Sequence, residues 1–180
     1  MINKLIIIEG FWGLGKTTLI NELHDTFNHQ IIHEPNHLLG DPRRKEMSEK
    51  VNNIKNRELW RPFAPSIISE YTQEFFEEDI ESPYMLYTFK VKDKYKKIIP
   101  AVCHVDGTSR AQTVTKHSNK LFWGLLNEFK IITGIPLVLN TSFNGPGEPI
   151  VSSPEDALKM FLRTKLDTLI IGNYIVKKYE

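Results

Sequence analysis

The sequence between Leu137 and Asp156 constrains the fold most, because it combines a strand, a glycine turn and a capped helix start. Leu137–Leu139 is a short apolar run typical of a buried strand. Gly145-Pro146-Gly147 then indicates a turn. Ser153, followed by proline and two acids, is typical of a helix start. A strand, a turn and a helix in this order predict an α/β fold.

Short polar residues lie beside the glycines of this turn: Asn140, Thr141, Ser142 and Asn144. At the end of a strand, hydroxyl groups, amide groups and backbone N–H groups converge on an anion. An ordinary capped turn needs the same residue types. The pattern therefore predicts either an anion site or a structural turn.

The N-terminal segment has the pattern of a phosphate-binding loop. An apolar run, Leu5–Ile8, precedes G-x-x-x-x-G-K-T, and a segment with helical spacing follows. Glycine backbone N–H groups would face phosphate oxygens, the lysine would reach the terminal phosphates and the threonine would ligate Mg²⁺. We predict a P-loop strand–helix–strand unit over residues 1–38, with nucleotide bound by Gly10, Gly13, Gly15, Lys16 and Thr17.

A working P-loop kinase also needs an acid that orients Mg²⁺ at the end of another strand. The one later run of this kind is Ala101–Asp106, which makes Asp106 the candidate. The kinase-like pattern ends near His37. A phosphotransferase that acts on a nucleoside or another small molecule is therefore an alternative function.

A basic segment occupies the middle of the chain. A predicted helix over residues 44–55 ends at Lys55. Arg57 and Arg61 follow, so three cations stand within seven positions, beside Trp60 and Phe63. A run of charges is most often a solvated face. Cations beside aromatic rings and prolines are instead suited to a preorganised phosphate or carboxylate clamp.

Hydrophobic periodicity predicts the remaining elements. Strands are expected at residues 84–91 and 98–105, and a turn at 106–109 is expected to join the second one to 110–115 in a hairpin. A helix is expected over 119–133, ended by Gly134 and Pro136. A helix over 154–164 and closing strands at 167–171 and 174–177 complete the prediction.

Composition limits the class of partner. The net charge is +1, with 23 basic against 22 acidic residues, so no global field favours nucleic acid or a membrane surface. The single cysteine, Cys103, fits a small core residue in a reducing compartment. Neither a membrane helix nor a signal peptide is predicted, and we expect a cytoplasmic protein. His29, His33 and His37 lie in predicted strand and turn, so no metal site is expected.

Residues 140–176, NTSFNGPGEPIVSSPEDALKMFLRTKLDTLIIGNYIV, resemble the C-terminal end of the O-carbamoyltransferases of the nodulation protein U, cephalosporin and nebramycin type. Four further blocks match in the same order: LGDPRR (39–44), IKNRELWRPFAPS (54–66), SPYML (82–86) and IPAVCHVDGTSRAQTV (99–114). The resemblance covers about four fifths of the chain. Several independent blocks make it more specific than any single motif.

The resemblance implies that residues 39–180 form a YrdC-like twisted mixed sheet with flanking helices. In the family such a domain makes carbamoyl adenylate from ATP and carbamoyl phosphate, with Mg²⁺ sharing the charge. An actin-like domain then transfers the carbamoyl group to an alcohol. By the same resemblance the catalytic residues are Lys55, Arg110 and Ser142, and the residues that bind substrate or nucleotide include Arg57, Met85 and Asn144.

The sequence also departs from the family. A longer opening stretch with a Gly-Pro-Arg-Ala-Leu-Gly-type motif is echoed only by Leu39–Arg44, and the P-loop unit stands in its place. The actin-like domain is absent, so we expect a separate actin-like domain as partner for transfer to the alcohol. A non-catalytic module that binds a nucleotide or a partner is a third alternative.

Overall fold

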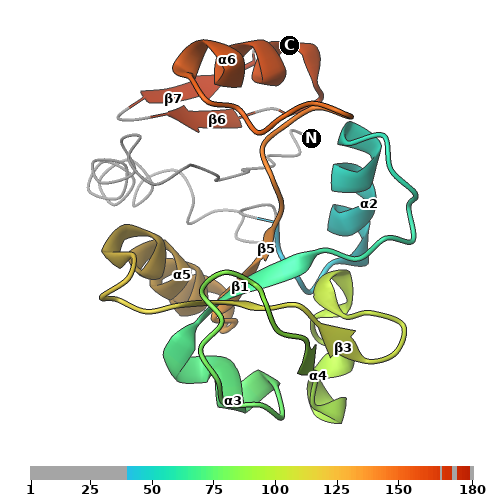
Figure 1. The fold of residues 1–180 in the computed structure, drawn as a ribbon, viewed down its shortest axis with the longest axis vertical. Helices are drawn as coiled ribbons and strands as arrows, with labels where there is room; N and C mark the ends of the chain where they lie inside the picture. Colours follow the sequence, from blue (N-terminus) through green and yellow to red (C-terminus); the bar gives the residue numbers. More distant parts are fainter. Residues whose placement is uncertain (1–39, 167, 172–173, 179–180) are drawn as a thin grey trace.

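The computed structural model describes residues 40–166, 168–171 and 174–178, and these form a mixed α/β fold (Figure 1). The predicted P-loop unit lies outside this part of the chain. The elements are α2 (Lys45–Ile54), β1 (Ala64–Ile68), η2 (Ser69–Tyr71), α3 (Thr72–Phe75), β2 (Phe89–Lys90), α4 (Asp93–Lys96), η3 (Pro100–Val102), β3 (Thr108–Ser109), β4 (Gln112–Val114), α5 (Lys120–Thr133), β5 (Leu137–Asn140), α6 (Pro154–Arg163), β6 (Thr168–Ile171) and β7 (Tyr174–Lys177).

The central sheet has three strands in the order β4-β1-β5. β1 runs parallel to β4, with Ser66 opposite Gln112, and antiparallel to β5, with Ala64 opposite Asn140. Two small antiparallel sheets, β2-β3 and β6-β7, complete the strand pairing among the described residues. The sheet is therefore mixed, as the resemblance implies.

Two hydrophobic clusters stabilise the fold. The larger cluster lies between the central sheet, α3, α5 and η3, and includes Ile67, Phe89 and Leu126. The smaller cluster joins α2, α6 and β6, and includes Val51, Phe143 and Phe161. Leu139 on β5 packs against both clusters. Figure 1 shows the consequence: β5 runs from the lower half, with α3, α4 and α5, toward the upper half, with α6, β6 and β7.

The two long C-terminal helices form as predicted because their caps are encoded locally. Asn119 Oδ1 accepts a hydrogen bond from Phe122 N at 3.0 Å at the start of α5. Gly134, with φ of +76°, ends that helix in the left-handed conformation that glycine adopts at low cost. Ser153 Oγ accepts a bond from Asp156 N at 3.1 Å and caps α6. The predicted helix before Lys55 and the strands after residue 166 are also confirmed.

The predicted strand at 84–91 is wrong except for its last residues, where β2 and an isolated bridge at Val91 form. Met85 has φ of +60°, which is incompatible with a β-strand. The preceding backbone is held as a loop, because Thr113 N donates to Ser82 O at 3.1 Å and Gln112 Nε2 donates to Pro83 O at 3.1 Å. Between this region and the next, residues 93–96 form the short helix α4.

The predicted strand at 98–105 and its hairpin are also wrong. Pro100 lacks an N–H group and begins the short helix η3. A tight turn does form, because His104 N donates to Thr108 O at 2.7 Å. Its arms pair elsewhere: β3 pairs with β2, and β4 pairs with β1. The central strand β1 was not predicted, since Pro62 and Pro65 flank or interrupt it.

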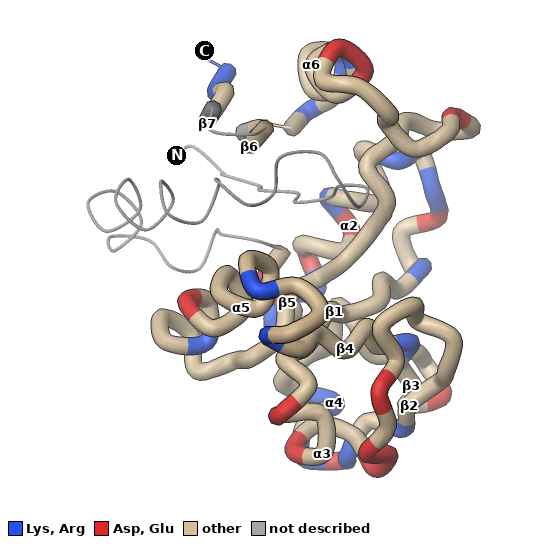
Figure 2. The backbone as a smooth tube through the Cα atoms, turned by 60° about the vertical axis from the view of Figure 1, so that its left-hand side comes forward, with Lys and Arg blue, Asp and Glu red and all other residues tan. Residues whose placement is uncertain are grey.

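Figure 2 shows lysine and arginine interspersed with aspartate and glutamate along the described backbone, without one large field of a single sign. No helix in the described ranges combines the length and the apolar composition that crossing a bilayer requires.

Candidate functional site

The strand directions bring three segments to one end of the central sheet. β1 is parallel to β4 and antiparallel to β5, so the starts of β1 and β4 lie beside the end of β5. The basic segment 55–63 leads into β1, Arg110 precedes β4, and the polar segment 140–144 follows β5. The sheet end is therefore where the predicted site residues meet.

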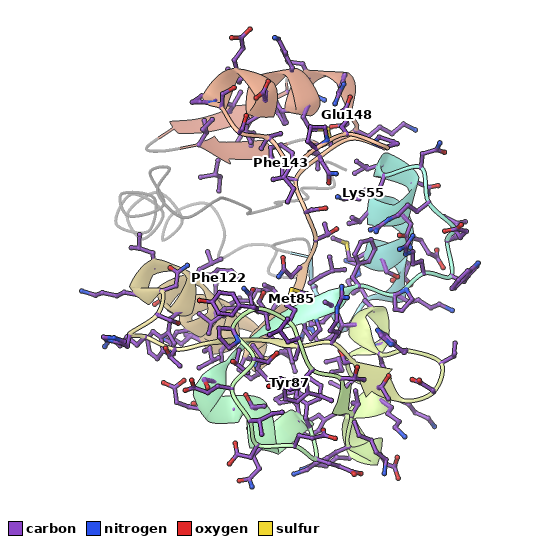
Figure 3. The ribbon with its side chains drawn as sticks, viewed as in Figure 1. Lys55, Met85, Tyr87, Phe122, Phe143 and Glu148 are labelled. Atoms are coloured by element: carbon purple, nitrogen blue, oxygen red, sulfur yellow. The ribbon has the colours of Figure 1, made fainter. Side chains whose placement is uncertain are left out.

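Lys55, at the C-terminal end of α2, reaches the segment that follows β5. Its Nζ donates to Ser142 Oγ at 3.0 Å and to Asn144 Oδ1 at 2.8 Å, and it also donates to the backbone oxygen of Ser142. Ser142 Oγ donates in turn to Asn144 Oδ1 at 2.7 Å. Lys55 is only 7% exposed, and these oxygens replace the hydration that burial removes. Figure 3 labels Lys55 beside the chain that connects β5 to α6.

The turn that carries Asn144 is held in place by α6. Asn144 Nδ2 donates to Glu148 O at 2.7 Å, and Gly145 N donates to Glu148 Oε2 at 3.2 Å. Arg163 on α6 donates through Nη1 to Glu148 Oε1 at 2.6 Å, and its hydrogen bonds, aided by its charge, hold the pKa of that carboxyl below its usual value. A Cβ at Gly145 would lie 2.5 Å from Glu148 Oε2, so a larger residue there would displace the end of the Glu148 side chain.

Two residues beside the site adopt a left-handed backbone without being glycine. Asn56, with φ of +49°, follows Lys55, and Met85 has φ of +60°. Asn140 Nδ2 lies 3.7 Å from Met85 Sδ and donates to Gln112 Oε1 at 3.0 Å, which places Met85 against the end of β5. Such conformations cost free energy and are concentrated at functional sites.

The two predicted arginines share this end of the sheet but differ in environment. The Arg57 guanidinium stacks 4.7 Å above the Phe63 ring, and Phe63 leads directly into β1. Arg110 is exposed and precedes β4. None of the hydrogen bonds described joins either arginine to Ser142 or Asn144. The structure thus brings Lys55, Ser142 and Asn144 together. It places Met85 beside Asn140 at the end of β5 and leaves Arg57 and Arg110 without a bond to this group.

Residues that sequence reasoning missed shape the basic segment. Asn52 is fully buried on α2, and its Nδ2 donates to Arg61 O at 2.7 Å and to Leu59 O at 3.3 Å. Its backbone oxygen accepts a bond from Arg57 N at 2.9 Å. An asparagine beside Val51 on the apolar side of a helix is unfavourable unless its amide has hydrogen-bond partners. This position in the sequence could therefore have indicated that Asn52 holds a neighbouring segment. No sequence pattern around Glu148 or Gln112 indicates that these residues support the site.

The proposed kinase acid is not placed as a P-loop enzyme requires. Asp106 lies in an exposed turn, and its Oδ1 accepts bonds from Thr108 N at 2.9 Å and Thr108 Oγ1 at 2.7 Å. The prediction that it ends a strand is wrong, because residues 100–102 form η3. Gly10, Gly13, Gly15, Lys16 and Thr17 lie outside the described residues.

Cys103 is half-buried against the larger cluster, in agreement with its prediction as a core residue. Burial raises the pKa of its thiol. In the part of the chain that the structure covers, no three histidine, cysteine or acidic side chains are grouped to hold a metal ion.

A family model described as Carbamoyltransferase C-terminus matches residues 36–178. The nodulation protein NolNO of Sinorhizobium fredii is 45% identical over 145 residues, which cover 78% of this chain and 21% of that protein. The 3'-hydroxymethylcephem-O-carbamoyltransferase of Amycolatopsis lactamdurans is 31% identical over 173 residues, 96% of this chain and 30% of that protein.

The nodulation protein U of Bradyrhizobium diazoefficiens is 38% identical over 107 residues, 59% of this chain and 19% of that protein. The chain thus spans between about a fifth and a third of the length of these curated relatives.

Proposed function

Since the chain belongs to the carbamoyltransferase C-terminal family, we propose that residues 39–180 are a YrdC-like domain that binds ATP and carbamoyl phosphate and forms carbamoyl adenylate. The family supports transferase chemistry. The finer assignment is our proposal, and the observation that supports it is the convergence of Lys55, Ser142 and Asn144 on one point.

The proposed chemistry brings two polyanions together, so its main requirement is fixed positive charge and hydrogen-bond donors. Lys55 supplies a buried ammonium group, and the Ser142 hydroxyl lies 3.0 Å from it. In this proposal, the ammonium group and the hydroxyl exchange their mutual hydrogen bond for bonds to the oxygens of a bound anion. We assign Lys55, Ser142 and Arg110 to charge stabilisation at the reacting phosphoryl group, and Asn144, Arg57 and Met85 to substrate binding.

The proposed formation of carbamoyl adenylate has two steps. A water molecule takes the phosphoryl group of carbamoyl phosphate, which leaves carbamate and inorganic phosphate. A carbamate oxygen then attacks the α-phosphorus of ATP, the bond to the β-phosphate oxygen breaks, and pyrophosphate leaves. Mg²⁺ bound together with ATP would lower the negative charge of the phosphates.

Transfer of the carbamoyl group to an alcohol is assigned to a separate actin-like domain. This assignment follows from the resemblance. The alcohol acceptor is outside the proposal.

ATP–pyrophosphate exchange in the presence and absence of carbamoyl phosphate tests the proposal. We expect carbamoyl phosphate-dependent exchange in the wild type and a loss of about a hundredfold in Lys55→Ala, the size typical of removing one preorganised charge-stabilising donor. Lys94→Ala, on the remote helix α4, is the matched control and should keep full exchange. Exchange that survives Lys55→Ala but is lost in Lys16→Ala would refute the proposal in favour of a P-loop enzyme. Absence of exchange in the wild type would leave a binding module.

A further inference from the structure

One face of the central sheet carries a row of polar side chains where β5 ends. Ser66 of β1 lies opposite Gln112 of β4, and Ala64 of β1 lies opposite Asn140 of β5. Because alternate residues of a strand share a face, Ser66, Gln112 and Asn140 lie on the same face of the sheet. Ser66 is fully buried, so its hydroxyl needs a partner inside the protein.

Gln112 connects this row to the loop that precedes β2. Its Oε1 accepts hydrogen bonds from Ser66 Oγ at 2.7 Å and from Asn140 Nδ2 at 3.0 Å, and its Nε2 donates to Pro83 O at 3.1 Å. A carbonyl oxygen such as Pro83 O can only accept, so the amino group of the Gln112 amide must face it. The Gln112 oxygen then faces Ser66 and Asn140. The direction of this amide is therefore set by the backbone at Pro83.

The direction of Gln112 in turn fixes the direction of the Asn140 amide. Gln112 Oε1 can only accept, so Asn140 presents Nδ2 to it, and the same Nδ2 lies 3.7 Å from Met85 Sδ. Nδ2 thus has a partner for each of its two N–H groups. Oδ1 lies on the opposite side of the amide, and no donor within the described ranges bonds to it. Asn140 is half-buried, so a ligand can reach this acceptor.

The position of this acceptor relates it to the anion site. Asn140 is the last residue of β5, and Ser142, two residues later, accepts from Lys55 Nζ at 3.0 Å. The groups around Ser142 are suited to phosphoryl oxygens, which every acyl phosphate carries. An acceptor beside them distinguishes what is attached to the phosphoryl group, because an amino group can donate to Asn140 Oδ1 and a methyl group of similar size cannot.

We propose that Gln112 is a positioning residue that fixes the Asn140 amide so that Oδ1 accepts a hydrogen bond from an amino group of the substrate. This inference rests on the proposed function, whose two substrates both carry such a group: the carbamoyl amino group of carbamoyl phosphate and the 6-amino group of adenine in ATP. Asn140 contacts the substrate, whereas Gln112 acts through Asn140. Selectivity for an amino group is the property that this arrangement adds to anion binding.

Isothermal titration calorimetry of the full chain with paired ligands tests this role. Acetyl phosphate carries a methyl group in place of the carbamoyl amino group, and inosine triphosphate carries an oxygen in place of the adenine amino group. We expect the wild type to prefer the amino ligand of one pair by about tenfold, the size of one hydrogen bond. The pair whose preference depends on Gln112 identifies which amino group Asn140 binds.

Three variants separate orientation from stability. Gln112→Met has a similar length but no amide, so the Asn140 amide can turn, and the preference should fall to about twofold or less. Gln112→Glu still accepts from Asn140 and should keep the preference, while the loss of its bond to Pro83 O weakens both ligands of a pair alike. Gln73→Met, the same exchange at an exposed position of α3, is the matched control and should keep the wild-type preference.

A merely structural role for Gln112 predicts that Gln112→Met weakens both ligands of a pair equally, and an unchanged preference in that variant would overturn the inference. A wild type without a preference in either pair, or a preference lost in Gln112→Glu, would overturn it too. If Gln112→Met does not fold, Asn140→Ala, which removes the acceptor, decides together with Gln112→Glu. The outcome is separable from that of the proposed function. A Gln112-dependent preference without nucleotide exchange supports this inference alone, whereas exchange without a preference supports the reaction alone.

Discussion

Replacing Asn52 by alanine tests whether the basic segment is held by one buried amide. The change removes the bonds from Nδ2 to Arg61 O at 2.7 Å and to Leu59 O at 3.3 Å. A net hydrogen bond is worth about 1 kcal/mol, and a buried acceptor left without a donor costs about 1–3 kcal/mol. The bond to Leu59 O is long and therefore weak. Asn52 Oδ1 is buried without a partner among the described residues, so removing the side chain also removes the free-energy cost of burying that oxygen. We therefore expect a loss of about 2–3 kcal/mol in the free energy of unfolding.

Urea unfolding followed by circular dichroism measures this loss, and thermal unfolding should show it as a fall in Tm of about 2–4 °C per kcal/mol for a chain of this size. Asn52→Asp is the isosteric companion. Its carboxylate would face two carbonyl oxygens, so burial and repulsion should raise the pKa of the introduced carboxyl above its unfolded value. Relative to the wild type, the stability of Asn52→Asp should then be greatest below the ordinary aspartate pKa and fall as pH rises toward the raised pKa. A loss below about 0.5 kcal/mol in Asn52→Ala would refute the reasoning, because it falls within the range of an ordinary surface substitution.

Three further predictions concern other positions. Asp41 is fully buried and accepts a hydrogen bond from Arg43 Nη2 at 2.6 Å. Asp41→Asn should lower the free energy of unfolding, measured in urea, by about 3 kcal/mol, the low end for a buried ion pair because Arg43 is partly exposed to solvent, and a loss under about 1 kcal/mol would contradict this. Arg163 lowers the pKa of Glu148, so the Tm advantage of wild type over Glu148→Gln should hold at neutral pH and disappear as pH falls below the ordinary glutamate range; a constant difference down to pH of about 2 would argue against the pair. Gly134→Ala should cost about 1 kcal/mol by urea unfolding from its φ of +76° alone, since no atom lies within 4 Å of the added Cβ, and an unchanged midpoint would count against backbone strain.

Local signals predicted the elements whose ends are encoded nearby. Asn119 and Ser153 cap their helices, Gly134 ends one, and the Gly145-Pro146-Gly147 turn follows β5 as expected. The predictions failed where backbone partners come from distant segments. Ile67 and its neighbours on β1 pair with two strands more than forty residues away, and no local pattern indicates such pairing.

In the site, too, local features were predicted and contacts between distant segments were not. The residue types of Lys55, Ser142 and Asn144, together with the resemblance, indicated an anion site, and the structure shows that these residues meet. The contacts that hold the site in place could not be predicted from the sequence. Glu148 and Arg163 are 15 residues apart, and Asn140 contacts Met85 across 55 residues. The exchange experiment tests the roles proposed for these residues.

β5 belongs to both hydrophobic clusters through Leu139, whose N–H also donates to Gly40 O at 2.9 Å. A strand shared in this way makes the two halves unfold cooperatively, because neither can open without stripping apolar contacts from the other. Amide hydrogen exchange along β5 should therefore be among the slowest in the chain. Partial opening of either half would disperse the groups around Ser142, so anion binding would report on the integrity of the whole described fold.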